Sequence, residues 1–529
     1  MKKINRGILS ALLAVAVCAL ALGSCAKRAW SPKTPTTTSR GEKTDEDIHL
    51  GADAPGRVGP TAPDRTAYLT STPWLEVVAK EVPLLQHSRA DRWPMIMWEG
   101  VGFAPLAADQ IQMLLARGLT QHLRLDQGMI DAAKALQEAG SPVIFMQGDA
   151  GAWPYSLAAD SSAWAHQFDV GYHYKMAGRG ALGAWHGACP KMIAGWELMA
   201  DQVRDTLGAF RAAGVTVDAV WMDWEGDPYP WSHLFKQLAH CQRCRVQLPP
   251  EVLADEDQYW AYYWRHYHQL YGAYLAGPVR EIFPLCSITN WHTVYSTQTR
   301  PLLYFVNNRA LPPGIPPLFT ATNPVAYGND KFWQTAWQDD YPLDQRHVNQ
   351  LHMHNLLRQI SGDAANRLVY GPEVASFPWV ARWCPIVNHR EDEAPYMTRE
   401  AYREALRHMW LRGIDGMQLF NARREGYEEI ALFEVLDAVA VYDEMLGYRD
   451  FLDAGQVMNL AEPAVQDEGV LWSGLRLEER AVVRLFSQGE GAARFELEVW
   501  PGHEIDLEAP TEGRTYVLGR MNTGVEILE

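Results

Sequence analysis

From Trp93 to Leu446, short apolar runs alternate with longer segments in which apolar residues recur every three or four positions. Short apolar runs bounded by Gly, Pro or polar residues favour buried strands, and the longer period favours amphipathic helices. The pattern predicts strands at 93–98, 119–125, 142–146, from 215 to the acids at 223 and 225, and at 285–291, 318–325, 367–374 and 416–420. It predicts helices at 106–116, 128–139, 192–213, 257–282, 343–360, 399–411 and 428–446. Strands that alternate with helices form parallel sheets, and eight such strands close most simply into a (β/α)8 barrel of the α/β class.

The pattern changes on both sides of this region. Residues 26–66 are rich in Thr, Pro, Ser and Gly and hold too few apolar residues for a packed core, which predicts a disordered tether. After Gly447, short segments of alternating apolar and polar residues predict a small antiparallel β-sandwich. We therefore expect a leader at 1–24, a tether at 25–66, the barrel at 67–446 and the sandwich at 447–529.

The fourth predicted strand carries two acids at its exit, Asp223 and Glu225, before Gly226 and Pro228 end the extended run. Side chains two positions apart in a strand share a face, so the two carboxylates are expected to be neighbours. Neighbouring carboxylates raise each other's proton affinity, so one can donate a proton near neutral pH while the other stays charged. This is the chemistry of glycoside cleavage. The other interpretation of an Asp-x-Glu sequence is one solvated loop acid beside a structural one.

Polar side chains also follow the other predicted strands. In a parallel barrel the carboxyl ends of all strands meet at one rim, so these residues are expected to converge on one cavity. Strand ends are often polar because they meet water, and a solvated rim is the alternative for each of them. The candidates for substrate binding are Glu99, Asp126, Asp149, Asn290, His292, Asn323 and Asn421, with Glu373 as a further acid.

Aromatic residues are frequent, with 21 Trp and 22 Tyr. Flat aromatic rings stack on the apolar faces of sugars, while most aromatic side chains in any protein serve the core. Tyr327 and Trp379 fall near predicted strand ends and are added to the candidates for substrate binding.

The formal net charge is −17, from 47 Lys and Arg against 64 Asp and Glu, without a basic run. This composition argues against nucleic acid as a partner. Lys2, Lys3 and Arg6 precede the apolar stretch 8–22, which is the charge pattern and length of a cleaved signal peptide.

The end of this leader, Leu22-Gly23-Ser24-Cys25, resembles the lipobox of bacterial lipoproteins. That resemblance implies cleavage before Cys25 and lipid attachment at this residue. Because Ala26 rather than Asp follows the Cys, the resemblance further implies an outer-membrane address. We expect a lipid-anchored protein of the cell envelope, and an ordinary cleavage site with a chance Cys is the alternative.

The leader and anchor contain Cys18 and Cys25, so five of the seven cysteines remain for the folded part. The pair Cys241-Gln-Arg-Cys244 is open to three interpretations: a local disulfide, an inert pair, or a zinc site with His233 and His240. The zinc spacing matches no standard structural site, and we expect no cofactor and no metal.

The sequence Asp218-Ala-Val-Trp-Met-Asp-Trp-Glu225 resembles the fourth-strand motif D-x-x-D-x-D-x-E of family 18 chitinases, and its Asp-Trp-Glu part is similar to that of hyaluronidases. Both families are eight-stranded barrels. The resemblance implies that Glu225 protonates the glycosidic oxygen and that Asp223 orients the 2-acetamido group of the substrate. The motif differs at Trp221, where the chitinases have their middle Asp, and the Met-Tyr-Asp signature near the sixth strand is replaced by Asn323 to Tyr327.

A second resemblance concerns many retaining glycosidases on this barrel, which carry an acid/base Glu after strand four and a nucleophilic Glu after strand seven. Glu225 and Glu373 occupy those places in the predicted strand order. These enzymes have Asn before the strand-four Glu, and this chain has Trp224.

Three functions remain open at this point. The first is a surface-tethered glycoside hydrolase that acts on an oligo- or polysaccharide. The second is a non-catalytic glycan-binding lipoprotein, because binding and cleavage share most contacts. The third is a barrel hydrolase with a metal at His292 and the rim acids, for which the sequence has no H-x-H pair or comparable ligand spacing.

Overall fold

A computed structural model describes residues 63–98, 104–146, 191, 193–221, 242–255, 258, 262, 266, 269–270, 272–292, 320–329, 344–370, 374–382, 395–420, 428–463 and 468–529. The chain divides into two compact units, Met1–Gly51 and Ala52–Glu529. All described residues belong to the second unit.

The parallel strands are short and mostly buried, as expected for strands covered on both faces. They are β1 (Met95–Met97), β2 (Leu119–Thr120), β3 (Leu123–Arg124), β4 (Ile144–Met146), β5 (Ala219–Trp221), β6 (Ser287–Thr289), β7 (Trp291–His292), β8 (Ala321–Tyr327), β9 (Ala375–Ser376), β10 (Trp379–Ala381) and β11 (Gln418–Leu419). Three pairs, β2 with β3, β6 with β7, and β9 with β10, follow each other directly in the chain.

Every pairing among these strands is parallel. The strands form two sheets, one with the order β2-β1-β11-β10-β8-β7 and β9 paired to β8, and one with the order β3-β4-β5-β6. The pairs are β1–β2, β3–β4, β4–β5, β5–β6, β7–β8, β8–β9, β8–β10 and β10–β11. In addition, the last strand pairs with the first, through Ile96 with Gln418 and Met97 with Leu419. The predicted parallel sheet of an α/β fold is therefore confirmed.

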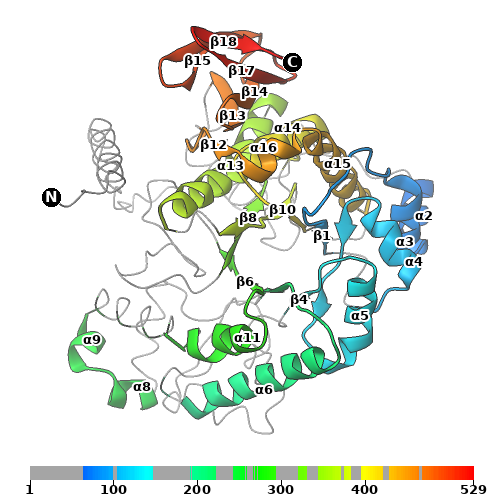
Figure 1. Cartoon of the computed structure of the whole chain (residues 1–529), viewed down its shortest axis with the longest axis vertical. Helices are drawn as coiled ribbons and strands as arrows, with labels where there is room; N and C mark the ends of the chain where they lie inside the picture. Colours follow the sequence, from blue (N-terminus) through cyan, green and yellow to red (C-terminus); the bar gives the residue numbers. More distant parts are fainter. Residues whose placement is uncertain are drawn as a thin grey trace, which may run out of the picture. The chain divides into compact units, whose positions relative to one another are not determined.

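Two helices precede the first of these strands, and the others lie between or after the strands along the chain. They are α2 (Pro63–Ser71), α3 (Trp74–Glu81), α4 (Ala108–Leu115), η2 (Gln127–Met129), α5 (Ile130–Glu138), α6 (Ile193–Ala212), α8 (Gln242–Gln247), α9 (Pro250–Ala254), η4 (Gly272–Ala276), α11 (Gly277–Ile282), α13 (Gln345–Tyr370), α14 (Arg399–Trp410), α15 (Glu428–Leu446) and α16 (Arg449–Ala454). Figure 1 shows α4, α5, α6 and α11 on the outside of the strands. None of the helices in the described ranges is long and apolar enough to cross a membrane.

Helix α14 illustrates why these segments form helices. Thr398 caps its first turn, where the side-chain oxygen accepts a hydrogen bond from the N–H of Ala401 at 3.2 Å. Leu406, Met409 and Trp410 lie on the buried face, at the spacing that places residues on one side of a helix. The apolar stripe of the sequence thus becomes the contact with the sheet.

The prediction of the seventh strand at 367–374 is wrong. Helix α13 continues through Tyr370, and the strand segment begins only at Ala375. The apolar residues near the end of α13 resemble a strand, but Arg367 is anchored as part of the helix. Its Nε donates to Asp363, one helical turn earlier, at 3.1 Å, and its Nη1 and Nη2 donate to the carbonyls of Val374 and Gly413.

A smaller correction concerns the predicted tether, which was expected to run to residue 66. Helix α2 already begins at Pro63, a residue type favoured in the first helical turn. Its Arg65 donates to Glu429 on α15 at 3.2 Å and to Glu81 at 3.3 Å. These contacts attach the start of α2 to the remainder of the fold, so residues 63–66 are part of a helix.

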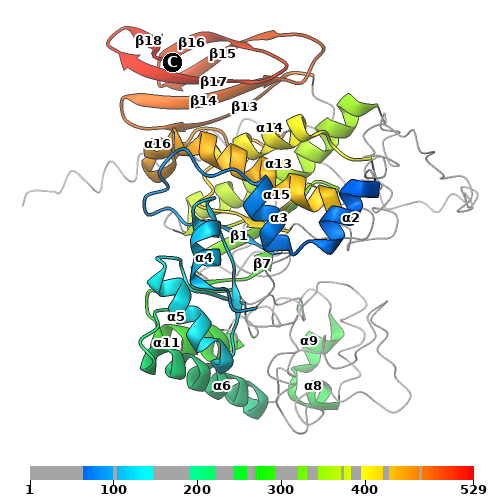
Figure 2. The same cartoon turned by 90° about the vertical axis from the view of Figure 1, so that its right-hand side faces the viewer.

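The C-terminal region is antiparallel, as predicted. A five-stranded sheet has the order β12-β13-β14-β17-β18, and β15 and β16 form a separate two-stranded sheet. The strands are β12 (Gln456–Val457), β13 (Val470–Arg476), β14 (Arg480–Ser487), β15 (Ala493–Trp500), β16 (His503–Ala509), β17 (Arg514–Met521) and β18 (Gly524–Ile527). The sequence pattern did not predict β16 or β18. Figure 2 shows the two sheets stacked beyond α13 and α14.

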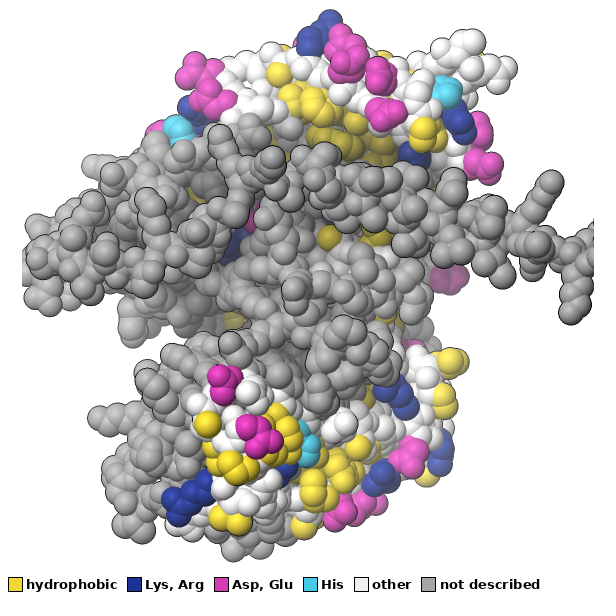
Figure 3. Space-filling model, turned by 90° about the vertical axis from the view of Figure 1, so that its left-hand side faces the viewer, with side chains coloured by type: hydrophobic (Ala, Val, Ile, Leu, Met, Phe, Trp, Pro, Cys, Tyr) yellow, Lys and Arg dark blue, Asp and Glu magenta, His cyan; other side chains and the backbone are white. Residues whose placement is uncertain are grey.

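One apolar cluster fills the space between the two C-terminal sheets, with Leu485, Leu497 and Leu518 among its members. The opposite face of the larger sheet adds Leu475 and Val482 to the main core of the parallel region. The antiparallel sheets are therefore packed on the helices rather than joined by a free linker. On the face in Figure 3, acidic and basic side chains are interspersed over these strands at the top.

Candidate functional site

Aromatic side chains gather where the parallel strands end. We call this group the aromatic cluster. Its buried members are Met146, Trp221 and Trp379, and Trp98, Tyr327 and Phe420 pack against them. Met146, Trp221 and Tyr327 are the last residues of β4, β5 and β8. Trp98 and Phe420 follow β1 and β11 directly.

The rings of the cluster are in mutual contact. The Trp221 and Trp379 rings have centroids 4.7 Å apart, and Trp98 lies 5.2 Å from Trp379 with its ring nearly perpendicular. Phe420 lies 5.6 Å from Trp379 and stacks on Tyr327 at 5.4 Å. These separations are those of favourable aromatic pairs. Six strands thus contribute to one cluster, five of them with an aromatic ring.

The alternation of side chains along the strands explains this placement. Ile96, Ile144 and Ala219 form a small buried cluster of their own. The residues two positions further along are Trp98, Met146 and Trp221, on the same face of the same strands. The two groups are therefore successive layers, in which the aromatic cluster is the one nearer the carboxyl ends.

His122, which lies between β2 and β3, completes the aromatic surface. Its ring centroid is 5.2 Å from Trp98 and 6.2 Å from Trp221, and the side chain is 4% exposed. Burial among apolar rings disfavours the imidazolium, which lowers the pKa of His122 to about 3. The imidazole is thus neutral at physiological pH, so it adds a hydrogen-bonding ring without adding charge.

Two indole N–H groups of the cluster are chemically unsatisfied. The Nε1 atoms of Trp221 and Trp379 are buried, and no group in the described part of the chain accepts a hydrogen bond from them. A buried donor without an acceptor is costly, so an oxygen placed here would be stabilised. The cluster therefore offers both ring faces and donors.

Asp218, the first residue of the sequence 218–225 that carries the predicted acids, has a structural contact. It precedes β5, and its Oδ2 accepts the N–H of Val143 at 2.7 Å while its own N–H donates to the Val143 carbonyl at 2.9 Å. Burial raises the pKa of Asp218, and the hydrogen bond from Val143 opposes this shift. This carboxylate links the starts of two neighbouring strands, at the edge opposite to the aromatic cluster.

Several predicted residues lie outside the described ranges. They are Cys25, Glu99, Asp149, Asp223, Glu225, Glu373 and Asn421. The roles predicted for them stay predictions. Of the described candidates, Asp126 is exposed and caps η2, where its Oδ1 accepts the N–H of Gly128 at 2.7 Å. This contact is a local turn rather than part of the aromatic cluster.

The other described candidates divide into two groups. Tyr327 and Trp379 belong to the aromatic cluster, although Trp379 lies within β10 and not in a loop. Asn290 is buried after β6, and His292 ends β7. Asn323 is fully buried within β8 rather than at its end, and its amide donates to the carbonyl of Phe377. That bond joins β8 to the link between β9 and β10.

The predicted place of Glu373 after strand seven does not hold. The strand segment of β9 and β10 covers Ala375–Ala381, so Glu373 precedes it in the chain and follows α13. The residue that follows this strand is Arg382, which is 2% exposed. The strand-order argument for a nucleophilic Glu373 therefore loses its basis.

No group of three or more His, Cys, Asp or Glu that could hold a metal ion occurs within the described ranges. Cys286 is a free, buried cysteine. Burial, followed by the nearby charge of Asp218, raises the pKa of the Cys286 thiol to about 12, so the thiol stays protonated and unreactive.

No family model matches this chain, and no curated protein matches it. Solved structures that overlap with it include the alpha-L-fucosidase isoenzyme 2 from Paenibacillus thiaminolyticus, at 11% identity and a TM-score of 0.40 over 72% of this chain and 50% of that chain. A cyclic alpha-maltosyl-(1→6)-maltose hydrolase from Arthrobacter globiformis matches at 11% identity and a TM-score of 0.40, over 85% and 95% of the two chains. An alpha-amylase from Geobacillus thermoleovorans matches at 9% identity and a TM-score of 0.41, over 91% and 94%.

These three neighbours are glycoside hydrolases. The chain spans half the length of the fucosidase structure. At these TM-scores the backbones of the two chains superpose only approximately. The activities in the names are those of the neighbouring proteins.

Sequence reasoning missed His122, Phe420 and Arg382. For His122 and Phe420 a signal existed, because each lies in or directly after a short apolar run that ends in a strand. Arg382 was missed because the seventh strand was predicted at the wrong residues. With the strand at its observed position, Arg382 follows the carboxyl end of β10 and would have been a candidate.

Proposed function

We propose that the chain is a hydrolase of glycosidic bonds, with Glu225 as the proton donor and Asp223 as the assisting carboxylate. The observation that carries this proposal is the position of Trp221, which ends β5 within the aromatic cluster. Asp223 and Glu225 follow it by two and four residues. In an extended chain these positions share one face, so both acids would be directed to the side of the cluster.

The fold that we propose for this function is a closed (β/α)8 barrel. It is supported by the pairing of β1 with both β2 and β11, and by the chain-order pairing from β3 to β6 in the second parallel sheet. In such a barrel the loops after the strands surround one cavity, and catalytic residues lie at the carboxyl ends. The aromatic cluster occupies those ends, which is where a substrate would bind.

The proposed substrate is an oligo- or polysaccharide. Aromatic rings stack on the apolar faces of sugars, and the indole N–H groups of Trp221 and Trp379 could donate to sugar hydroxyl oxygens. The family 18 scheme, in which a 2-acetamido group of the substrate is the nucleophile, needs only Asp223 and Glu225 from the chain. The retaining scheme needs a second carboxylate as the nucleophile. The observed strand order no longer supports Glu373 in that role.

We further propose that lipid on Cys25 anchors the protein at the cell envelope, on the outer membrane. The lipobox of the leader supports this, and the residues between Cys25 and α2 would form the tether. A hydrolase held in this way would meet glycans outside the cell.

A non-catalytic glycan-binding lipoprotein is the competing function. The aromatic cluster supports it equally well, because stacking surfaces serve binding and cleavage alike. The two proposed functions differ in whether the acids after Trp221 cleave the bound glycan. The decisive experiment therefore changes Glu225.

The test is steady-state kinetics of Glu225→Gln on aryl glycosides and natural glycans. Loss of the transferable proton should lower turnover on the natural glycans by ~10²- to 10⁴-fold, while binding is retained. An activated aryl leaving group needs less protonation, so it should partly restore the rate. The matched control is Glu251→Gln, an exposed acid on α9 that should behave as wild type. Full activity of Glu225→Gln would refute this mechanism, and binding without turnover by wild type would favour the glycan-binding function.

A further inference from the structure

Arg382 is a buried arginine whose charge is not neutralised by the described chain. It directly follows β10 and is 2% exposed. Its Nε and Nη2 atoms are buried and donate to no acceptor. A buried cation without a partner is strongly unfavourable, and proteins otherwise pair such groups.

The two unsatisfied atoms lie on one edge of the guanidinium. The N–H groups of Nε and Nη2 are parallel, and their spacing matches the two oxygens of a planar carboxylate. The free edge of Arg382 therefore has a preferred ligand chemistry. A single-atom anion such as chloride could not accept both parallel N–H groups with the geometry of a carboxylate.

Two other arginines of this protein use the same edge in the same way. Arg399 donates from Nε and Nη2 to the two carboxylate oxygens of Asp437, at 2.9 and 2.7 Å. Arg484 donates from Nε and Nη2 to the two oxygens of Glu404, at 2.7 and 2.5 Å. In the described part of the chain, Arg382 presents this edge without a carboxylate.

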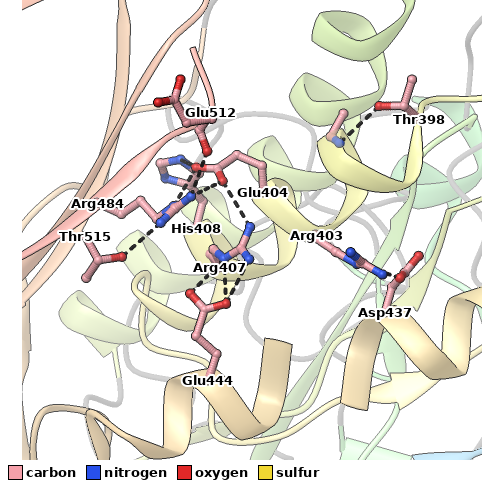
Figure 4. A network of polar contacts seen from close by, with 11 residues as sticks. Thr398, Arg403, Glu404, Arg407, His408, Asp437, Glu444, Arg484, Glu512 and Thr515 are labelled. Carbon is pink, nitrogen blue, oxygen red and sulfur yellow. Dashed lines mark hydrogen bonds and ion pairs between the residues drawn. The ribbon is translucent and has the colours of Figure 1, made fainter. Parts of the chain in front are cut away.

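The surroundings of Arg382 favour a bound carboxylate rather than a mobile side chain. The charge of Arg382 contributes to the lowered pKa of His352, which burial reduces to about 3, so this neighbour on α13 stays neutral. Tyr402 on α14 is fully buried, its hydroxyl has no acceptor within the described ranges, and burial raises its pKa, so it remains a donor. The buried carboxylates of Glu434 and Asp437 on α15 also raise the pKa of Tyr402. Asp437 accepts hydrogen bonds from Arg399 and Arg403, and Figure 4 shows the latter contact.

A close backbone contact fixes the strand end that carries Arg382. A Cβ atom at Gly328 would lie 2.6 Å from the Arg382 carbonyl oxygen and 3.2 Å from Nδ1 of His352. The Gly328 N–H donates to the carbonyl of Ala381 at 2.9 Å, and its own carbonyl accepts from Asn355 at 3.0 Å. The ends of β8 and β10 are thus held against α13, which gives Arg382 a rigid base.

We propose that Arg382 is a binding site for the carboxylate of a sugar acid, so that the ligand of this protein contains a hexuronate. The sugar part of this inference rests on the proposed function, and the carboxylate part rests on the free edge of Arg382 alone. Arg382 and Trp379 are three positions apart on one strand end, so the site lies on the opposite face of that end from the aromatic cluster. One ligand could contact both faces only around the end of the strand.

The test measures binding by the full-length chain, with thermal shift and calorimetry, and uses D-glucuronate against neutral D-glucose. Glucuronate should raise the Tm of wild type by about 2 °C or more in a concentration-dependent way, and glucose should not. Arg382→Met should abolish the shift. Arg382→Lys keeps the positive charge but loses the two parallel N–H donors, so it should weaken binding by about tenfold or more. An unchanged glucuronate shift in Arg382→Met would overturn the proposal.

Two controls keep these results interpretable. If Arg382 has no partner in the free protein, Arg382→Met should unfold at the same temperature as wild type or higher, because a buried unpaired charge is removed. Arg484→Met, which breaks a formed pair, should lower the Tm clearly. A large loss of Tm in ligand-free Arg382→Met would show that the chain itself supplies a partner and would overturn the proposal. A shift by acetate equal to that by glucuronate would overturn the assignment to a sugar.

These outcomes are independent of catalysis, because the measured quantity is binding. Hydrolysis of neutral glycans that depends on Glu225, without glucuronate binding, would refute this inference and leave the proposed function intact. Glucuronate binding that depends on Arg382, without hydrolysis of any glycan, would refute the proposed function and support the inference.

Discussion

Arg484 on β14 donates two hydrogen bonds, of 2.7 and 2.5 Å, to the carboxylate of Glu404 on α14. Both side chains are less than one-tenth exposed. Figure 4 shows this pair at the centre of a polar network that connects α14 and α15 to the C-terminal sheet. Arg407 adds a contact to Glu404 at 3.3 Å and binds Glu444 on α15 at 2.8 Å. The joint between the parallel region and the antiparallel sheets is therefore ionic as well as apolar.

Arg484→Met should destabilise the protein by ~3 to 5 kcal/mol, because Glu404 would remain buried and lose two of the three hydrogen bonds that its carboxylate accepts in the described part of the chain. Chemical denaturation followed by circular dichroism measures this change. The control is Arg494→Met on β15, whose side chain is 74% exposed and lies 3.7 Å from Asp506. Loss of this exposed pair should cost less than about 1 kcal/mol. Equal effects of the two substitutions would contradict a structural role for the buried pair.

The stability of this joint should depend on pH through Glu404. Burial alone would raise the pKa of Glu404, but His408 and Arg484 outweigh it and lower the pKa to about 2, from an ordinary value of 4.5. A depressed carboxyl pKa stabilises the fold fully above the ordinary value, and this stabilisation is lost as the pH falls through the folded value. The difference in unfolding free energy between wild type and Glu404→Gln should therefore shrink by roughly 3 kcal/mol between pH 5 and pH 2.

The measurement is denaturant unfolding of both proteins at several pH values. Glu496→Gln, at an exposed position of β15, is a suitable control because its carboxylate faces water. A difference between wild type and Glu404→Gln that stays constant across this pH range would contradict the assignment to Glu404.

Gly513 should resist substitution for a reason separate from backbone strain. It has φ +71°, and a Cβ atom there would lie 2.5 Å from Nη2 of Arg484 and 2.6 Å from Oε1 of Glu404. Gly502 has nearly the same φ, +74°, with nothing within 4 Å of the added Cβ. Gly502→Ala should cost about 1 kcal/mol from strain alone, and Gly513→Ala should cost ~2 kcal/mol more, because the buried pair must move. Equal losses in thermal unfolding would show that the pair tolerates the methyl group.

Asp223→Asn should lower the turnover of glycan hydrolysis and shift the alkaline limb of its pH profile, which reports the protonated Glu225. A charged Asp223 raises the proton affinity of its neighbour Glu225, so removing the charge should move that limb to lower pH. Steady-state rates of wild type and variant across pH 4 to 9 measure the shift. A changed rate with an unshifted profile would indicate that Asp223 positions the substrate without acting on the acid.

Cys25→Ser should release the mature protein from the membrane fraction. Lipid on this residue is expected to supply the affinity, since the residues after it have no apolar segment of their own. Fractionation of expressing cells with detection of the C-terminal region measures the effect, and Cys18→Ser within the leader is the matched control. Membrane association that survives Cys25→Ser would refute the lipid anchor.

The sequence by itself determined the order and type of most elements. The apolar period identified α14 and α15 to within a residue or two, because a helix that covers a sheet must carry its apolar residues on one face. The alternation of strands and helices likewise determined a parallel α/β sheet.

Other features depended on contacts between distant parts of the chain. The end of α13 and the start of β9 were misplaced, because the Arg367 contacts with the carbonyls of Val374 and Gly413 exist only after the fold has formed. The aromatic cluster needed residues from six strands to meet, which no local pattern encodes. The buried partners of Glu404 and the open edge of Arg382 were also invisible in the sequence. A charged side chain looks the same in the sequence whether it meets water, a counter-ion or a ligand, and only tertiary packing decides among them.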